Sequence, residues 1–234
     1  MSRLNLTIAT GDYDRTRPIS DGRVNIEGVE PNHLFFSPEE MFYRAFRFQS
    51  FDVCELSFSS YCVGAANPDF PYIAIPVFLS RSFRHSAIFT RTDSHITKPS
   101  DLLGKTLGVT EYQLTANVWV RGILENYYGV PQTKIKWIRG GLYDPKRPEK
   151  IKVKLPEALD YRNAPEGTTL NELMESGKID GLIGPRPPRG FYSNTKYSRL
   201  FPNTFEAVAD YYQNTQIFPI MHVLGIKKEV VSQH

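Results

Sequence analysis

Short apolar runs alternate with stretches of helical periodicity along the first 91 residues of the chain. Polar and apolar residues alternate in Leu4–Thr10, which predicts a strand. Ser37, followed by Pro38 and Glu40, is typical of the first turn of a helix. The same criteria predict further strands at Pro31–Phe36, Phe51–Leu56, Tyr72–Phe78 and Ser86–Arg91, and a helix at Ser59–Ala66.

A second group of elements follows Thr92. The strand Thr106–Val109 leads to an amphipathic helix over Gln113–Tyr128, which Gly129 is expected to end. Tyr143–Ala164 is charged, contains prolines and has no clear period, so we predict a surface loop there. The other predicted elements are strands at Lys134–Ile138 and before Gly184, a helix at Thr169–Ser176, and a strand at Met221–Ile226 that returns to the first group. This alternation predicts an α/β protein with mostly parallel strands.

Composition places the chain among globular proteins. Hydrophobic residues make up 41% and charged residues 23% of the 234 residues, which excludes disorder, collagen and coiled-coil rods. Lys and Arg number 28 against 25 Asp and Glu, and this net charge of +3 predicts no nucleic-acid partner. The sequence has neither a long apolar run nor a signal-like N-terminus, so we expect no membrane partner and a cytoplasmic location. Homo-oligomer formation is left open.

The sequence carries no cofactor or zinc motif. Cys54 and Cys62 are too few for a disulfide framework, and both are expected to be buried free thiols. His-x-x-x-His, His-Glu-x-x-His, Gly-x-Gly-x-x-Gly and phosphate-loop patterns are absent, so we predict neither a nucleotide cofactor nor structural zinc. A divalent metal is left open, because Asp12, Glu55 and His85 could meet only in three dimensions.

Candidate site residues follow the predicted strands, because parallel α/β sheets bind ligands at the carboxyl ends of their strands. Asp12 is interpreted as a base or as a partner of Arg15, with helix capping as the alternative. Glu55 is a carboxylate among apolar neighbours, which suits acid–base chemistry, with an ordinary edge-strand glutamate as the alternative. The hydroxyls of Ser57 and Ser59 are expected to bind a carboxylate or to cap the next helix.

Arg81, Arg84 and His85 lie close together between two apolar strands. A guanidinium binds a carboxylate through paired N–H donors, and an imidazole exchanges a proton near neutrality. The segment is therefore interpreted as an anion-binding loop with an acid–base residue, with a solvated basic loop as the alternative. His222, in the returning strand, is a second candidate, and a core histidine is its alternative.

The second group offers further anion-binding candidates. Thr110, Glu111 and Tyr112 follow a strand and open a helix, where free N–H groups attract anions. Arg186, or Arg189, lies in a proline-rich loop after another strand and is interpreted as an anchor for a second carboxylate. A surface loop is the alternative for this arginine.

Three segments together resemble the 4,5-dihydroxyphthalate decarboxylase family, a branch of the type 2 periplasmic-binding-protein superfamily. They are Leu-Thr-Ile-Ala-Thr-Gly-Asp-Tyr-Asp-Arg-Thr (6–16), Phe-Asp-Val-Cys-Glu-Leu-Ser-Phe-Ser-Ser-Tyr (51–61) and Ile-Pro-Val-Phe-Leu-Ser-Arg-Ser-Phe-Arg-His-Ser (75–86). Asp-Leu-Leu-Gly-Lys-Thr-Leu-Gly-Val (101–109) is common to the wider superfamily. The resemblance implies a two-lobed fold with a ligand cleft between the lobes. Lobe 1 is expected to comprise 1–91 and 205–234, truncated at its C-terminal end, and lobe 2 to comprise 92–204.

The resemblance also implies an activity. The expected reaction is non-oxidative decarboxylation of a 4,5-dihydroxyphthalate-like aromatic dicarboxylate to a dihydroxybenzoate and carbon dioxide, without an organic cofactor. In this interpretation His85 is the acid and Asp12 or Glu55 the base. The carboxylate anchors are Arg15, Arg81, Arg84 and Arg186. The alternative is a solute-binding protein or sensor that closes on a small organic acid without converting it.

Overall fold

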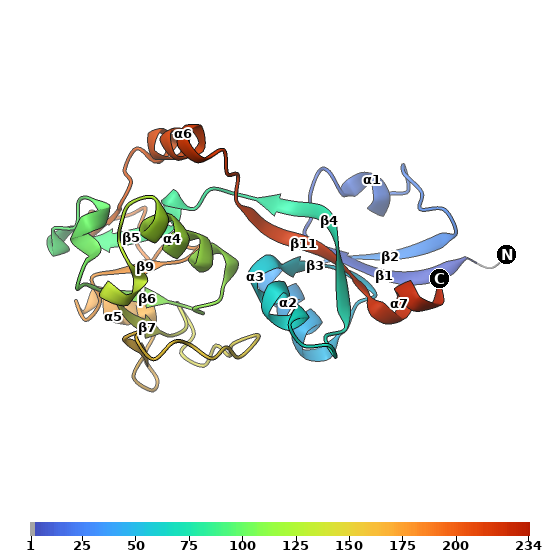
Figure 1. Cartoon of the computed structure of the whole chain (residues 1–234), viewed down its shortest axis with the longest axis horizontal. Coiled ribbons are helices and arrows are strands. Elements are labelled where there is room, and N and C mark those ends of the chain that lie inside the picture. Colours follow the sequence, from blue (N-terminus) through green and yellow to red (C-terminus); the bar gives the residue numbers. More distant parts are fainter. Residues whose placement is uncertain (1–2) are drawn as a thin grey trace. The chain divides into compact units, whose positions relative to one another are not determined.

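The computed structural model describes residues 3–234 and contains two compact units (Figure 1). Unit 1 is formed by the chain up to Arg81 together with Ile220–His234, and unit 2 is formed by Ser82–Pro219. Each unit contains one β-sheet. The predicted α/β class is therefore confirmed, with the strands divided between two sheets.

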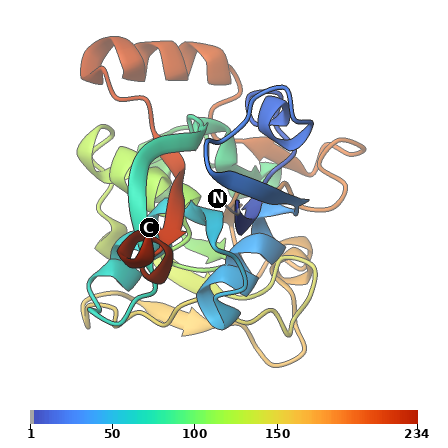
Figure 2. The same ribbon diagram turned by 90° about the vertical axis from the view of Figure 1, so that its right-hand side faces the viewer.

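The sheet of unit 1 has five strands in the order β2-β1-β3-β11-β4. β1 (Leu4–Thr10) runs parallel to β2 (Val29–Phe35) and to β3 (Val53–Ser57). β11 (Ile220–Lys227) lies antiparallel between β3 and β4 (Tyr72–Arg81), as Figures 1 and 2 show. Insertion of β11 beside β3 brings the last part of the chain next to a strand that lies far away in sequence.

The helices of unit 1 are α1 (Arg17–Ser20), α2 (Pro38–Phe48), α3 (Phe58–Ala65) and α7 (Lys228–Gln233). The predicted start of α2 is confirmed, because the Ser37 side chain accepts a hydrogen bond from the Glu40 amide. α2 buries Met41, Phe42 and Ala45 against the sheet. Most of the rest of this core comes from β1, β3, β4 and β11, through Ala9, Cys54, Leu56, Tyr72 and Val223.

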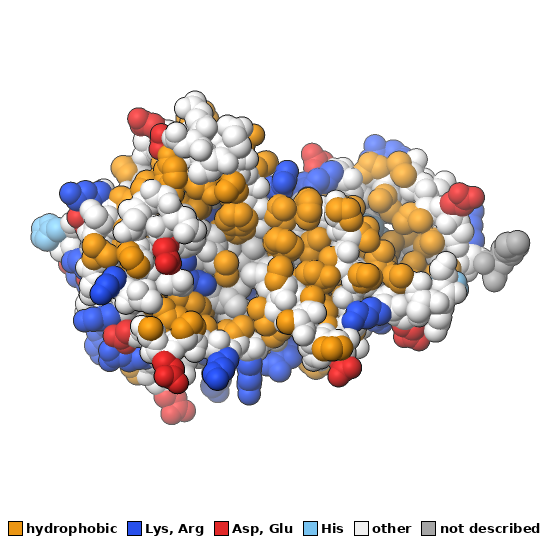
Figure 3. Space-filling view, viewed as in Figure 1, with side chains coloured by type: hydrophobic (Ala, Val, Ile, Leu, Met, Phe, Trp, Pro, Cys, Tyr) orange, Lys and Arg blue, Asp and Glu red, His pale blue; other side chains and the backbone are white. Residues whose placement is uncertain are grey.

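Apolar side chains also lie on the surface of unit 1. On the face seen in Figure 3, hydrophobic side chains gather over β4 and β11. β4 is an edge strand, and its residues Ile73, Val77 and Phe78 are exposed. Pro76 lies within β4 and has no N–H group, and proline within a sheet is typical of edge strands such as this one.

The sheet of unit 2 has six strands in the order β10-β5-β9-β6-β7-β8. Their bounds are β5 (Ile88–Arg91), β6 (Thr106–Val109), β7 (Lys136–Arg139), β8 (Tyr161–Asn163), β9 (Gly181–Ile183) and β10 (Tyr197–Arg199). The pairs β9-β6, β6-β7 and β7-β8 are parallel, whereas β10-β5 and β5-β9 are antiparallel. The sheet is therefore mixed, and its parallel strands end beside the loops that sequence analysis singled out.

The helices of unit 2 are α4 (Thr115–Asn126), α5 (Leu170–Glu175) and α6 (Thr204–Thr215). Four short 3-10 helices join them: η1 (His85–Ala87), η2 (Thr92–Ser94), η3 (Pro99–Leu102) and η4 (Gln132–Lys134). One core surrounds Leu107, Leu124 and Trp137, and a second surrounds Leu173 and Met174. The predicted loop at 143–164 contains the short strand β8, which pairs with β7 and which its polar sequence did not suggest.

The unit boundaries differ from the predicted lobe boundaries. The predicted lobes change near residues 91 and 205, whereas the compact units change after Arg81 and after Pro219. β5 pairs with β9 and β10, so the segment from Ser82 onward joins unit 2. α6 buries Tyr211 against η1 and therefore also belongs to unit 2.

The two cysteines lie in different environments. Cys54 is buried in β3, whereas Cys62 is exposed on α3, so the predicted burial of Cys62 is wrong. α3 turns Ser60 and Gly64 inward, one helical turn apart, which leaves Cys62 on the outer side.

Across residues 3–234, none of the helices combines the length and the apolar character needed to cross a membrane.

Candidate active site

Glu55 is the centre of a polar cluster in unit 1. It lies in β3 opposite Leu224 of β11, and its side chain has no exposed surface. A charged carboxylate without water needs hydrogen-bond donors from the protein to replace its hydration. The sequence provides these donors from the loop after β1 and from β11.

Three groups contact the Glu55 carboxylate. The Gly11 amide donates to Oε2 at 3.0 Å, and the Tyr13 hydroxyl donates to Oε1 at 2.8 Å. His222 Nδ1 lies 2.5 Å from the same Oε1. Burial alone would raise the pKa of Glu55, but His222, Gly11 and Tyr13 together hold this pKa below its ordinary value. The carboxylate is therefore ionised at neutral pH and can only accept hydrogen bonds.

His222 is oriented for proton transfer by this carboxylate. Because the Glu55 carboxylate can only accept, Nδ1 of His222 carries a proton and donates a hydrogen bond to Oε1. The edge-on contact with the Phe42 ring, 4.8 Å between centroids, packs the imidazole from another direction. The side chain is 15% exposed, and Nε2 makes no hydrogen bond within residues 3–234. A carboxylate that fixes one imidazole nitrogen and leaves the other accessible is an arrangement suited to general acid–base chemistry.

The loop after β1 supports this pair. The Arg15 guanidinium lies over the Tyr13 ring, with Cζ 3.9 Å from the ring centroid. Nε of Arg15 donates to the Leu79 carbonyl of β4 at 2.9 Å, and Nη2 donates to the same oxygen. A Cβ atom at Gly11 would come within 2.6 Å of the Tyr13 ring, so only glycine leaves room for this packing.

Other predicted residues of unit 1 lie outside the cluster. Asp12 is exposed and pairs with Arg17 at 2.8 Å. Ser57 is buried at the start of α3, with Ser60 Oγ 3.3 Å from its hydroxyl, and Ser59 follows on the same helix. Arg81 is exposed at the end of β4, near the Phe78 ring. In the described part of the chain, the Glu55 carboxylate and the His222 ring form hydrogen bonds with Gly11, Tyr13 and each other, and none of these four predicted residues takes part in them.

His85 lies in unit 2, in an aromatic environment. It is 1% exposed, and the Phe201 and Tyr211 rings both meet it at 5.2 Å between centroids. Neither of its ring nitrogens has a hydrogen-bond partner among residues 3–234, and burial lowers its pKa to about 4. The imidazole is therefore neutral and shielded from water at pH 7. This environment gives no support to the predicted role of His85 as the acid.

Glu111 is used inside unit 2 as a counter-ion. Lys150 Nζ contacts both carboxylate oxygens of Glu111 at 2.7 and 2.8 Å, and Arg147 lies 3.2 Å from one of them. Thr110 and Tyr112 are also buried. The Tyr112 hydroxyl donates to Gln132 at 2.6 Å. The geometry therefore gives the predicted anion-binding role of these three residues no support.

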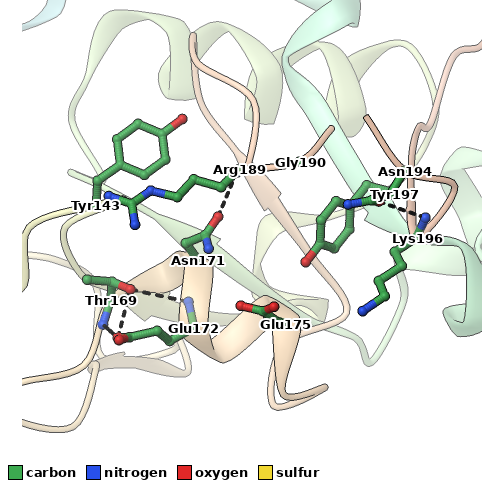
Figure 4. Close-up of a pocket in the computed structure, with 10 residues that line it drawn as sticks. All are labelled: Tyr143, Thr169, Asn171, Glu172, Glu175, Arg189, Gly190, Asn194, Lys196 and Tyr197. Carbon is green, nitrogen blue, oxygen red and sulfur yellow. Dashed lines mark hydrogen bonds between the residues drawn. The ribbon is translucent and has the colours of Figure 1, made fainter. Parts of the chain in front are cut away.

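The arginines of unit 2 lie in different settings. Arg84 precedes His85, and burial lowers its pKa. Arg186 is exposed and lies over the Tyr143 ring, 5.8 Å from its centroid. Arg189 lines a pocket of about 440 Å³ beside α5 (Figure 4). This pocket is polar, and its lining includes exposed charged side chains of both signs, Glu172, Glu175 and Lys196.

Over residues 3–234, no three His, Cys, Asp or Glu side chains come together as metal ligands would. Asp12, Glu55 and His85 therefore do not form the set that sequence analysis left open.

Tyr13 was not predicted to be a site residue. Its only sequence signal was its place in Gly-Asp-Tyr-Asp-Arg directly after a strand. His222 was predicted as a substrate contact, and its pairing with Glu55 depends on β11 lying beside β3.

No protein-family model matches the chain. The chain is 53% identical over 237 aligned positions to the 4,5-dihydroxyphthalate decarboxylase of Comamonas testosteroni, covering 100% of this chain and 71% of that protein. It is 49% identical to the 4,5-dihydroxyphthalate decarboxylase of Pseudomonas putida, covering 91% of this chain and 83% of that protein.

Solved structures show the fold. The periplasmic aliphatic sulphonate binding protein of Escherichia coli matches with a TM-score of 0.57 at 12% identity, over 99% of this chain and 68% of its own. The alkanesulfonate-binding protein of Xanthomonas axonopodis pv. citri matches with a TM-score of 0.53 at 11% identity, over 100% and 68%. These neighbours confirm the predicted periplasmic-binding-protein-like fold. The two relatives above show that the chain belongs to the 4,5-dihydroxyphthalate decarboxylase family.

Proposed function

We propose that this chain removes one carboxylate from 4,5-dihydroxyphthalate, or from a very similar aromatic dicarboxylate, to give a dihydroxybenzoate and carbon dioxide. Family membership supports the reaction class. The observation that carries the proposal is the Glu55–His222 pair, in which a buried carboxylate orients a partly exposed imidazole. The reaction requires a proton donor, and an imidazole oriented in this way can act as one.

The reaction needs one proton at carbon. Each carboxylate of the substrate is para to a hydroxyl group, and electron release from that hydroxyl makes the carboxylate-bearing carbon basic. A proton adds to this carbon, the bond to the carboxylate breaks, and its electron pair restores the aromatic ring as carbon dioxide leaves. The hydroxyl ends the reaction with the proton that it had at the start, so each turnover consumes one proton, which becomes the new hydrogen on the ring carbon.

His222 is the proposed proton donor. Its Nδ1 is held by Glu55, so the proton that reaches the substrate is carried on Nε2. Glu55, one of the two predicted bases, acts here by stabilising the charged imidazolium and fixing its orientation. The proposed donor is thus His222 in place of His85, whose ring is buried among aromatic side chains.

The carboxylate that stays on the ring needs a cationic anchor. Arg15 belongs to the same loop as Tyr13, and its side chain is 48% exposed. Its guanidinium carries five N–H donors, so it can bind a carboxylate while it remains attached to the Leu79 carbonyl. Arg81, Arg84 and Arg186 stay further proposed anchors.

The first prediction concerns turnover. Purified protein mixed with 4,5-dihydroxyphthalate is expected to release carbon dioxide and to form 3,4-dihydroxybenzoate. The change in ring absorbance measures product formation. His222→Asn should lower kcat by roughly 100-fold or more, because it removes the proton donor. His95→Asn is the matched control, since His95 is exposed and has a positive φ of 55°, which asparagine tolerates.

Two outcomes would contradict the proposal. Full activity in His222→Asn would exclude His222 as the donor. Absence of turnover in the wild type, with a rise in melting temperature on adding 4,5-dihydroxyphthalate, would favour a solute-binding protein.

A further inference from the structure

Tyr13 and His222 share one oxygen of Glu55. The Tyr13 hydroxyl donates to Oε1 at 2.8 Å, and His222 Nδ1 contacts that atom at 2.5 Å. The Gly11 amide binds the other oxygen, Oε2. Each donor draws negative charge toward itself, so a second donor on Oε1 weakens the attraction between this oxygen and the imidazole. Tyr13 therefore competes with His222 for the same charge.

Tyr13 is itself held in place by its neighbours. Arg15 lies over its ring at 3.9 Å and is attached to the Leu79 carbonyl through Nε and Nη2. A cation over the face of a phenol is attracted to the ring, fixes its position and makes the hydroxyl a stronger donor. Burial and the Glu55 charge both raise the pKa of Tyr13, so its hydroxyl stays protonated and remains a donor.

We propose that Tyr13, held by Arg15, is a positioning residue that keeps the Glu55–His222 pair ready to release its proton to the substrate. The inference rests on the proposed function, because it takes His222 as the proton donor. With the tyrosine hydroxyl on Oε1, the imidazolium is held less tightly and is a stronger acid. Without this hydroxyl, the pair holds its proton more tightly and protonates carbon more slowly.

The test is Tyr13→Phe, which removes the hydroxyl and keeps the ring under Arg15. The titration of His222 is followed by NMR in the ligand-free protein, with its ring signal assigned by comparison with His222→Asn. The titration midpoint is expected to move up by less than about one pH unit, because the lost hydrogen bond is to Glu55 and the imidazole experiences only part of its effect. In turnover assays, the alkaline limb of the pH–rate profile should move the same way, and the maximal kcat should fall roughly 2- to 3-fold.

Arg15→Met provides a second variant that retains the tyrosine hydroxyl. It removes the cation from the Tyr13 ring and leaves an apolar side chain of similar length. The His222 midpoint is expected to move in the same direction by a smaller amount. Arg17→Met is the matched control, because Arg17 lies two residues after Arg15 at the start of α1, carries the same charge and pairs with exposed Asp12. It should leave the midpoint unchanged.

The outcomes separate the two proposals. An upward shift in Tyr13→Phe, with the smaller shift in Arg15→Met, supports the inference even if 4,5-dihydroxyphthalate is not converted; the failed turnover would then count against the proposed function alone. An unchanged His222 midpoint in both variants overturns the inference even when decarboxylation is found. A shift of equal size in Arg17→Met also overturns it, because the effect would then come from loop charge.

Discussion

At the residue scale, the chemistry of this protein depends on how buried charges are compensated. The Glu55 carboxylate has no exposed surface, and the Gly11 amide, the Tyr13 hydroxyl and the His222 ring replace its water. His85 is the opposite case, because its ring nitrogens have no hydrogen-bond partners among residues 3–234. A compensated charge can take part in proton transfer, whereas an uncompensated imidazole stays neutral and costs stability.

His85 gives a prediction for stability against pH. Burial lowers its pKa from the ordinary 6.5 to about 4, with Asp210 opposing the shift. Between these two pH values His85 binds a proton in the unfolded chain but not in the folded protein. The free energy of unfolding therefore falls as the pH drops from about 6.5 to about 4. The loss from this group is about 3 kcal/mol at the acid end.

His85→Leu should remove this pH dependence. It should also raise stability at pH 7 by about 1 kcal/mol, because no unpaired imidazole remains buried. Urea denaturation of the wild type and the variant at pH 7 and pH 5 measures both effects, with His95→Asn as the exposed control. A variant that is less stable at both pH values would show that the histidine makes a favourable contact there.

His85 and His222 show that residue type can identify a candidate site residue but not its partners. Both His85 and His222 were recognised as candidates because an imidazole can exchange protons near neutrality. Local sequence favoured His85, which has two arginines beside it. The structure instead brings His222 to Glu55, 167 residues away in sequence, and buries His85 under Tyr211 of α6. Long-range pairing of this kind leaves no local signal.

At the element scale, strand register builds the candidate site. β11 lies antiparallel to β3 with Leu224 opposite Glu55 and His222 opposite Ser57. Side chains on one face repeat every second residue, so a slip of one residue would turn His222 to the other face of the sheet. A second long-range contact at this scale is the ion pair between Glu111 and Lys150. It attaches the 143–164 loop to the segment that precedes α4.

Lys150→Met tests that attachment. Glu111 is 0% and Lys150 5% exposed, so removal of the ammonium leaves a buried carboxylate with weaker compensation from Arg147. We expect a loss of about 3 kcal/mol in urea denaturation and faster proteolysis within the 143–164 loop. Lys152→Met is the matched control, since Lys152 is exposed in the same loop. Equal stability of the two variants would contradict a stabilising role for the pair.

Elements were predicted best where their signals are local. The Ser37 cap, the Thr106–Val109 strand and the end of α4 before Gly129 depend on neighbouring residues, and the structure contains all three. Prediction was poorer where pairing with a distant strand decides whether a strand forms or where it ends. β4 continues to Arg81 because it pairs with β11, and β8 forms because β7 lies beside it.

At the scale of the whole molecule, the two units have different relations to the chain. Unit 2 is continuous from Ser82 to Pro219 and has two hydrophobic cores, whereas unit 1 is made from two separated segments. A continuous unit with its own core is able to fold alone. Unit 1 needs β11, which reaches it only after the chain has passed through unit 2.

A fragment comprising residues 82–219 should therefore fold by itself. We expect a cooperative thermal transition and dispersed amide resonances in NMR, because its cores are complete. A fragment ending at Arg81 is the counterpart and should remain unfolded, since it lacks the strand between β3 and β4. Non-cooperative melting of the 82–219 fragment would show that unit 2 depends on unit 1.

The sequence by itself determined the α/β class, most strands and helices, the family and several candidate residues, because these follow from local periodicity, capping and short motifs. Tertiary structure alone decided which candidates meet. Glu55 acquires Tyr13 and His222 as partners only when β1, β3 and β11 form one sheet. It also decided which of the candidates lie in the interior, because burial and ion pairing are properties of the packed chain. His85 lies among aromatic rings, and Glu111 is paired with Lys150.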